Sequence, residues 1–502
     1  MQDLYNYQAL DAAGMGLNAE QIMKAMEAGL QTGRDYNNTD HTGGGLKTES
    51  LDAVVKVLES KMTDNVLFNG IGKQRIYNTV HEFNQLKKYG QEVGIFNLEG
   101  ETPQFTDSQY TRRSVITKFM GVGFQVTHPA TLVKTADGKN PLAREVENKT
   151  ALLLRAINRK LSVADSSKIA TEFDGIFRQH LIGVNEIYGA SAGKTEEQLM
   201  DTYFNDSASV IDARGHILTD SLIQDSADGI VNTRFGEVDT IISNPTVFND
   251  YVKQFQQYKQ VLVGGVNGVE NANMGQSVGT VTTQFGKLNI DNDKFFDRKE
   301  PRLYNEAATN AQAPTAPTKD GSTPIAVVSA DTKTKFTDGA GGYFYAVAAK
   351  NRYGVSAMTP INTTIQAVAA TESVDLKFAA TAGLYDTEAF VIYRTEKDVT
   401  PYTTAKYYPI FEVSVGSLAS GFDGAAANLV RDRNRFIPNT YRAMVYYKSN
   451  DMLEYLQFCP TMRMDLAQTS PSQRGLILNY GALAMYAPGK VSIIWNIGKK
   501  TA

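Results

Sequence analysis

The sequence predicts an α+β protein of roughly two or three domains, with an all-β sandwich inserted near its C-terminal end. Residues from Met120 to Thr127 alternate between apolar and polar, which is the period of a half-buried strand. Apolar residues at helical spacing mark one long helix over residues 140–161. At Ala307 the composition shifts to Ala, Pro and Thr, and only strand patterns follow up to about residue 423.

The bulk composition is that of a folded protein without a strong charge bias. Of 502 residues, 42% are apolar and 21% are charged, and 50 basic residues oppose 54 acidic ones. This balance argues against sequence-specific nucleic-acid binding, which needs a basic face. Cys459 is the only cysteine, which excludes an intramolecular disulfide and a thiolate zinc cluster. No long apolar run and no signal peptide is evident, so we expect no membrane span and synthesis in a cytoplasm.

Residues 1–65 are expected to form an N-terminal arm that includes helical segments. Asn18 can cap a helix whose apolar stripe runs from Ile22 to Leu30, and a second amphipathic helix is predicted over about residues 49–62. The residues around them are polar and rich in glycine. Such a segment can bury little of itself, so it is either a mobile tail or an arm laid on a neighbour.

A long polar loop is predicted over about residues 81–118, with its turn at EGETP (99–103). Its two strands of about eight residues would reach roughly 25 Å. A two-stranded hairpin is marginal alone in water, so the surface that supports it is expected to be another subunit. The expected contact residues are Glu99, Gly100 and Glu101 at the tip, with Arg112 and Arg113 on the return strand. The alternative is a solvated, charged loop of no consequence.

The rest of the region 66–305 predicts helices and strands in mixed order. Asn140 caps the long helix and Pro141 takes its first position. A further helix opens at Thr219, a buried strand covers 238–242, and another helix starts at Pro245. Strand patterns follow at 280–284 and 287–290.

The region 306–428 begins as a linker and continues as the predicted β sandwich. Six or seven short strands are expected, including 325–329, 343–350, 361–368, 374–378, 389–394 and 407–415. After it, the region 429–502 predicts strands that rejoin the first half, at 443–447, 456–458, 476–479 and 491–496.

This order of parts resembles the HK-ninety-seven-type major capsid proteins of tailed bacteriophages. HEFNQLKKYGQEVGIFNLEGETPQFTDSQYTRRSVITKFMGVGFQVTHPA is similar to their extended loop, and NPLAREVENKTALLLRAINRKL to their spine helix. VDTIISNPTVFNDYV, followed by GTVTTQFGKLNIDNDKFF, resembles their axial lobe. The resemblance implies an N-arm, an extended loop, a spine helix, and peripheral and axial lobes, over about residues 1–305 and 430–502.

The function implied by the resemblance is that of a structural virion protein, not an enzyme. Such a protein self-assembles through hexamers and pentamers into an icosahedral capsid, and it is assembled in the host cytoplasm. Portal, scaffolding and decoration proteins are the other implied partners, and packaged DNA is enclosed without sequence-specific binding. A near-neutral chain suits such a container.

The inserted region has a resemblance of its own. GYFYAVAAKNRYGVSA and DTEAFVIYRTEKD are similar to strands of fibronectin type III or immunoglobulin-like modules. Such insertions in phage capsids usually lie on the outer surface. The resemblance therefore implies an exposed module that makes weak contact with host-surface glycans or braces the shell.

A search for chemistry finds no catalytic, cofactor or metal motif. No two of the histidines have the i, i+4 spacing of a helical metal site; they are His41, His81, His128, His180 and His216. There is no phosphate-binding loop and no GxSxG nucleophile elbow. We therefore expect no cofactor. Two other functions stay open: an encapsulin-like nanocompartment shell, and a phage tail or surface adhesin that binds host glycans.

Overall fold

The computed structural model describes residues 61–92, 95–133, 140–188, 209–254, 279–321, 323–468 and 470–499. The predicted N-terminal arm lies outside these residues except for its last five. The chain forms two compact units, Met1–Leu58 with Pro129–Arg144, and Glu59–His128 with Glu145–Ala502. Of the first unit, the described residues are helical over most of 129–133 and 140–144. All sheets described below belong to the second unit.

The first sheet joins the two ends of the sequence. Its order is β1 (Gly72–Arg75), β21 (Leu453–Asp465), β22 (Ser472–Met485) and β4 (Lys118–Thr127). β1 pairs with β21 in parallel and the other pairs are antiparallel. The late strands predicted at 456–458 and 476–479 therefore do rejoin the first half of the chain.

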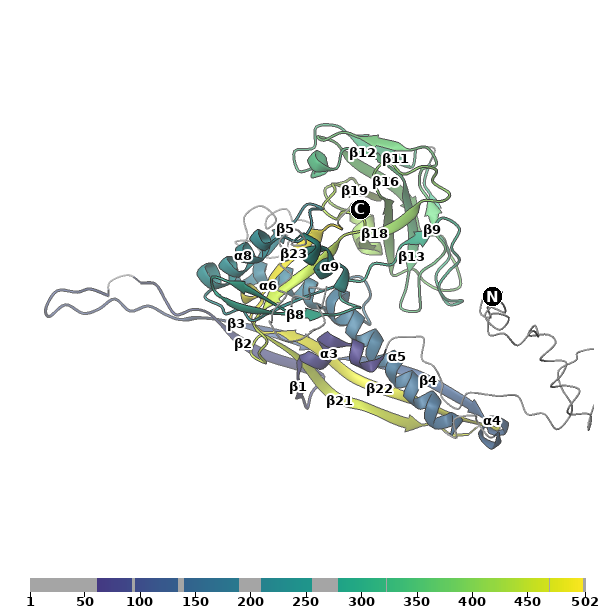
Figure 1. Cartoon of the computed structure of the whole chain (residues 1–502), viewed down its shortest axis with the longest axis horizontal. Coiled ribbons are helices and arrows are strands. Elements are labelled where there is room, and N and C mark those ends of the chain that lie inside the picture. The colour runs from purple at the N-terminus through teal and green to yellow at the C-terminus, as the bar shows by residue number, and fades with distance from the viewer. Residues whose placement is uncertain are drawn as a thin grey trace, which may run out of the picture. The chain divides into compact units, whose positions relative to one another are not determined.

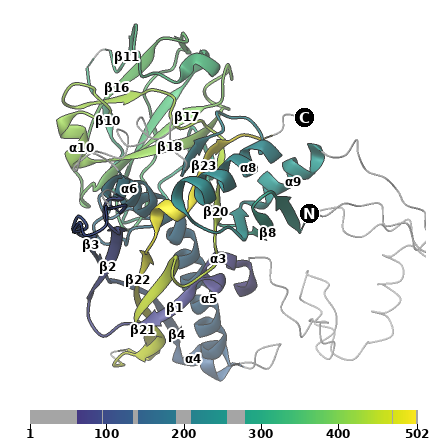
Figure 2. The ribbon, with the colours of Figure 1, turned by 90° about the vertical axis from the view of Figure 1, so that its left-hand side faces the viewer.

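The predicted long helix is α5 (Pro141–Val163), and it runs along this sheet (Figures 1 and 2). Its apolar stripe buries Leu153, Ile157 and Leu161, as helical periodicity requires. Asn158, on the same face, donates to Asp293 at 2.9 Å and accepts from the Phe68 N–H at 2.8 Å. The bond from Phe68 ties α5 to α3 (Val66–Gly70), and Asp293 also accepts from the Leu67 N–H of α3 at 2.9 Å. The short helix η1 (Met62–Asp64) precedes α3.

A six-stranded mixed sheet forms the second layer of the α+β core. Its order is β5 (Val210–Asp212), β23 (Ser492–Ile497), β20 (Tyr441–Tyr446), β6 (Thr240–Ser243), β8 (Gly286–Asn292) and β7 (Thr280–Thr283). Ile223, Ile230, Ile241, Leu288 and Ile494 belong to its buried cluster. Helices α8 (Asp220–Asp228), capped by Thr219, and α9 (Pro245–Gln254) contribute to that cluster, as does the π-helical turn Gly229–Thr233.

Several of the described helices were not predicted from the sequence, and the longest of them is α6 (Ile176–Tyr188). It buries Leu181 and Val184 completely, and also the polar residues Gln179 and His180. The Gln179 amide donates to the Leu483 carbonyl at 2.7 Å, and its oxygen accepts from the Met485 N–H at 3.1 Å. The short helix η5 (Pro488–Lys490) belongs to the same unit, and α4 (His128–Leu132) belongs to the first unit except for His128.

From Arg302 to Asp432 the chain forms strands and two short helical segments, η4 (Phe336–Asp338) and α10 (Val415–Ser420). One sheet has the order β14 (Thr359–Pro360), β13 (Tyr345–Lys350), β17 (Ala389–Thr395), β18 (Lys406–Ser414) and β9 (Arg302–Leu303). Another contains β10 (Thr318–Lys319), β16 (Ser373–Ala379), β11 (Ile325–Val328) and β19 (Leu429–Asp432). β12 (Gly341–Tyr343) pairs with β15 (Gln366–Val368).

The structure changes two details of the predicted β region. β9 and β19 pair with its strands, so the β structure extends beyond 306–428 on both sides. The strand predicted at 361–368 is regular only over Gln366–Val368. Before it, the Asn362 side chain accepts from the Tyr345 N–H at 2.7 Å and donates to the Tyr343 carbonyl at 3.0 Å. A side-chain amide thus satisfies backbone groups that a ladder would otherwise pair.

Candidate assembly site: the extended hairpin

The predicted contact residues lie on a two-stranded hairpin of β2 (Val80–Lys88) and β3 (Gln109–Ile116). The strands are antiparallel, with Val80 opposite Ile116 and Lys88 opposite Gln109. Partly buried and exposed positions alternate along both strands. One face therefore lies against the chain and the other faces away. The hairpin and its connecting loop project from the body of the unit (Figure 1).

The base of the hairpin is fixed to its own chain by polar and aromatic contacts. The Phe83 ring packs edge-on against Tyr486, with centroids 4.8 Å apart, and the Gln85 amide donates to the Tyr486 carbonyl. On the return strand, Arg113 Nε lies 3.0 Å from the Glu186 carboxylate of α6. These contacts set the direction in which the hairpin leaves the core.

The distal loop, 89–92 and 95–108 as described, has no such partners for its apolar side chains. Phe96 is 98% exposed and Phe105 is 90% exposed. Other large apolar side chains are exposed beside them: Tyr89, Ile95, Leu98 and Tyr110. Burying one such side chain is worth roughly 2 kcal/mol, so their gathering on one projecting segment is typical of a protein–protein contact surface.

The tip of the loop has the predicted turn. The Glu101 N–H donates to the Leu98 carbonyl at 3.0 Å, and the Glu101 carboxylate accepts from the Leu98 N–H at 3.2 Å. Gly100 has φ +87°, a left-handed conformation that favours glycine at the third turn position. Glu99 and Glu101 are exposed. The tip therefore presents two carboxylates on a hydrogen-bonded turn.

The two arginines of the return strand have different surroundings. Arg112 is 68% exposed and lies 3.4 Å from Glu82 on the facing strand. Arg113 is only 15% exposed and is paired with Glu186 of its own chain. Adjacent residues of a strand point to opposite faces, so only one of the pair can face outward. In the single chain, Arg113 therefore anchors the hairpin and Arg112 faces outward, and a contact of either residue with a neighbouring subunit stays a prediction.

A second exposed surface, which sequence reasoning missed, lies at the outer part of the first sheet. Phe119 on β4 is 65% exposed, and its ring meets Tyr480 at 4.9 Å between centroids. Met462, Met464 and Leu466 are exposed at the end of β21. β1 and β4 are the two edges of this sheet, and edge strands leave backbone groups open to pairing. Alternation within residues 118–127 was the available signal, since it implies one outward face.

The described residues show no centre for metal chemistry. No group of three or more His, Cys, Asp or Glu side chains is placed there to hold an ion. His180 is fully buried, its Nε2 lies 2.8 Å from the Val491 carbonyl, and burial lowers its pKa to about 4. Among the helices of the described residues, none has the length and apolar character needed to cross a membrane.

Comparison with known proteins decides the family. The model of the SU10 major capsid protein family matches residues 30–311, more than half of the chain. The chain belongs to this family. It is therefore a structural protein of a phage capsid, and the prediction of a tailed-phage major capsid protein is confirmed. The predicted α+β class is also confirmed. The hairpin, the single long helix, the mixed lobe and the returning strands follow one another in the predicted order.

The relatives agree with the family. The major capsid protein of Staphylococcus phage S25-3 is 24% identical over 498 residues, covering 95% of this chain and 96% of that protein. A structure from Gordonia phage Cozz overlaps with a TM-score of 0.41 at 7% identity, covering 92% of this chain and 98% of that one. The SrpI encapsulin complex of Synechococcus elongatus gives 0.40 at 6%, covering 89% and 93%. The family model and the relatives matched by sequence are phage capsid proteins, so the encapsulin-like alternative is the weaker match.

Proposed function

We propose that the chain self-assembles through hexamers and pentamers into an icosahedral shell of the HK-ninety-seven type, with the extended hairpin lying on a neighbouring subunit. The exposed apolar side chains of the distal loop carry this proposal, together with family membership. A loop that exposes Phe96 and Phe105 to water in one chain gains their burial when sister copies cover it.

Charge adds specificity to this contact. The tip presents Glu99 and Glu101, while Arg112 lies on the outward face nearer the base. A tip that meets the base of a neighbouring hairpin would place opposite charges together, and complementary charges fix register and steer encounter more than they add affinity. Gly100 keeps the turn that presents the carboxylates.

The test is assembly of a Phe96→Ser, Phe105→Ser double variant of the full chain, expressed with its genomic neighbours. We expect a folded protein that forms no shells by negative-stain microscopy and sedimentation. Leu384→Ser is the matched control, because Leu384 is equally exposed but lies outside the hairpin; it should assemble normally. Normal shells from the double variant would contradict the role of the hairpin.

We infer further that residues 306–428, with the flanking strands β9 and β19, are an immunoglobulin- or fibronectin type III-like module on the outer surface of the shell. Support comes from the sequence GYFYAVAAKNRYGVSA, which contains the end of β12 and all of β13 and buries Tyr345 completely. Tyr353 and Tyr385 lie 6.1 Å apart between ring centroids, with the Arg352 guanidinium 4.7 Å from Tyr353. Partly exposed aromatic rings suit weak contact with host glycans.

Adsorption of whole phage particles to host cells tests this role. A Tyr353→Ala, Tyr385→Ala variant should assemble and package normally but adsorb more slowly. Unchanged adsorption would leave bracing of the shell as the role of the module. Portal, scaffolding and decoration proteins, and assembly in the host cytoplasm, belong to the same proposal, and co-purification of the assembling shells from host lysate tests them.

A further inference from the structure

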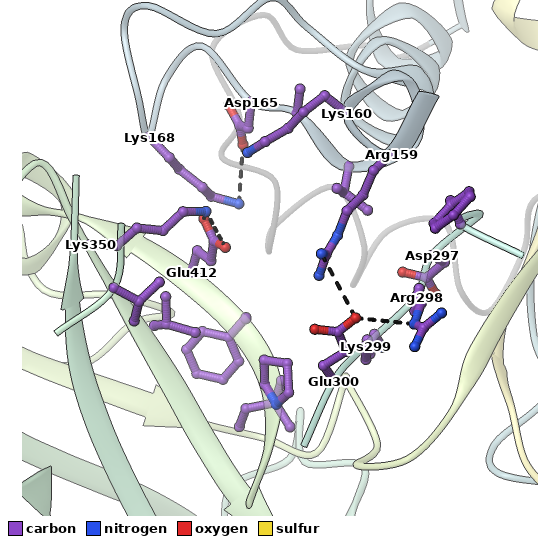
Figure 3. A pocket seen from close by; sticks show the side chains of 18 of the residues that line it. Arg159, Lys160, Asp165, Lys168, Asp297, Arg298, Lys299, Glu300, Lys350 and Glu412 are labelled. Carbon is purple, nitrogen blue, oxygen red and sulfur yellow. Dashed lines mark hydrogen bonds and ion pairs between the residues drawn. The ribbon is translucent and has the colours of Figure 1, made fainter. Parts of the chain in front are cut away.

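A cavity of about 830 Å³ lies between helix α5, the segment 295–302 and the β region. Figure 3 shows the charged side chains that line it. Ten lysine and arginine residues face five aspartate and glutamate residues there. The whole chain has the opposite balance, 50 basic against 54 acidic residues. The cavity lining therefore has an excess of basic residues, which the composition of the whole chain does not predict.

One group of cations gathers around Glu412 of β18. Lys350 of β13 lies 2.6 Å from its carboxylate. Burial alone would raise the pKa of Glu412, but Lys350, Lys168 and Lys160 outweigh it and lower that pKa. Burial and the nearby Lys350 lower the pKa of Lys160. The ammonium groups of Lys160 on α5 and of Lys350 in the β region are thus near enough to repel each other. Lys160 is paired with Glu172, and Lys168 with Asp165 at 3.1 Å.

A second group lies on another side of the cavity (Figure 3). Arg298 and Arg159 share the Glu300 carboxylate, at 3.1 and 3.9 Å. Lys299, which lies between Arg298 and Glu300 in the sequence, also lines the cavity. It has no hydrogen bond or ion pair among the described residues. Burial lowers the pKa of Lys299 to about 8; Asp297 opposes this and Arg442 adds to it. Lys299 is the side chain that would gain most from an anion.

We propose that the cavity binds a small polyphosphate anion, which bridges helix α5 and the inserted β region. Linked phosphates can meet the lysine group at one end and the arginine group at the other, whereas a single small ion can meet only one. Arginine forks bind phosphate oxygens in pairs, and ammonium groups bind them as point charges. The volume of about 830 Å³ is within the range of small-molecule sites and exceeds the need of one phosphate.

The experiment is calorimetric titration of the unassembled full chain with inorganic tripolyphosphate. We expect saturable binding at one site and a rise in Tm. Lys299→Met should weaken binding by roughly tenfold or more, since a charge-assisted bond is lost. It should leave the fold intact because Lys299 makes no hydrogen bond or ion pair among the described residues, and its neighbour Asp297 keeps the Arg442 guanidinium at 3.5 Å. Lys319→Met, an exposed lysine on β10, is the matched control and should bind as the unmodified chain does.

Further ligands separate the sources of phosphate. A nucleoside triphosphate that binds as tightly as tripolyphosphate, with the same dependence on Lys299, would support recognition of the phosphate chain. If orthophosphate binds with the same affinity as tripolyphosphate, the proposed bridging by linked phosphates is wrong. It is also wrong if a short oligonucleotide binds and tripolyphosphate does not. Absence of tripolyphosphate binding, or equal binding by Lys299→Met and the unmodified chain, would overturn the site.

Discussion

The extended hairpin and the β region of residues 302–432 differ in how far they bury their own side chains. The distal loop of the hairpin leaves Phe96 and Phe105 in water, whereas the β region buries even a charged side chain, Arg394, completely. The base of the hairpin is held by its own chain, but its distal loop has buried partners only in the assembly we propose, whereas the β region is stabilised by pairs within it. On that proposal, the stability of the single chain and its competence to assemble depend on different parts of the molecule.

The buried pairs of the β region share one feature: they join it to the strand that returns to the core. Arg394 on β17 lies 2.6 Å from Asp432 on β19, and Tyr345 donates to the same carboxylate at 2.9 Å. Further along the run RDRNR, Arg431 pairs with Asp375 and Arg433 with Asp331, each at 2.6 Å. Arg431 and Arg433, which alternate along one segment, therefore hold the C-terminal end of the β region in place.

Arg394→Ala should give the largest effect and would break the β side of the comparison. Burial opposes the charge of Arg394, but Asp432 and Tyr345 outweigh it and raise its pKa. Removing the guanidinium leaves the Asp432 carboxylate buried without its main partner, which costs roughly 3–5 kcal/mol. Denaturant unfolding of the unassembled chain measures this. An Arg394→Met, Asp432→Leu double variant should recover much of the loss; equal loss in both would mean that packing and not charge is decisive.

His180 should give the next effect, through pH. Burial lowers its pKa from 6.5 to about 4, so the unfolded chain binds the proton more readily than the folded one. The contribution of neutral His180 to the free energy of unfolding should therefore be fully present above pH 6.5. The free energy of unfolding should fall by about 3 kcal/mol as the pH drops towards 4. His180→Gln should remove this part of the pH dependence, and His81→Gln, on the hairpin, should not. An unchanged pH profile in His180→Gln would contradict this assignment.

The sequence was sufficient for elements whose pattern is local, and insufficient where tertiary contacts decide. α5 and β4 follow from periodicity alone, and the turn at Gly100 from its residue types. α6 was missed because Gln179 and His180 look like surface residues until bonds to β22 and to Val491 satisfy them. Strand alternation could have predicted that Arg112 and Arg113 point to opposite faces of the hairpin. The positive charge of the cavity could not be predicted from the sequence, because its cations come from segments far apart in the chain.

Glu186→Ala tests the joint between the hairpin and helix α6 of the core and should have a smaller effect. It removes the partner of Arg113 at the base of the hairpin. The pair is partly exposed, so a loss of about 1 kcal/mol or less is expected. Hydrogen exchange should become faster in β2 and β3 and stay unchanged in β13 and β17. Equal acceleration in the β region would show that the hairpin is not an independent element.

The smallest expected effect is the most informative about the hairpin. Phe96→Ser should change the free energy of unfolding of the unassembled chain by less than about 0.5 kcal/mol, because its ring is 98% exposed and has no internal packing to lose. Phe344→Ser is the matched substitution in the β region, where the ring is 3% exposed, and it should cost about 3 kcal/mol or more. Urea unfolding of the two variants measures the contrast directly. A loss near 2 kcal/mol or more in Phe96→Ser would mean that the distal loop packs on its own chain, and the hairpin would then resemble the β region in drawing its stability from within.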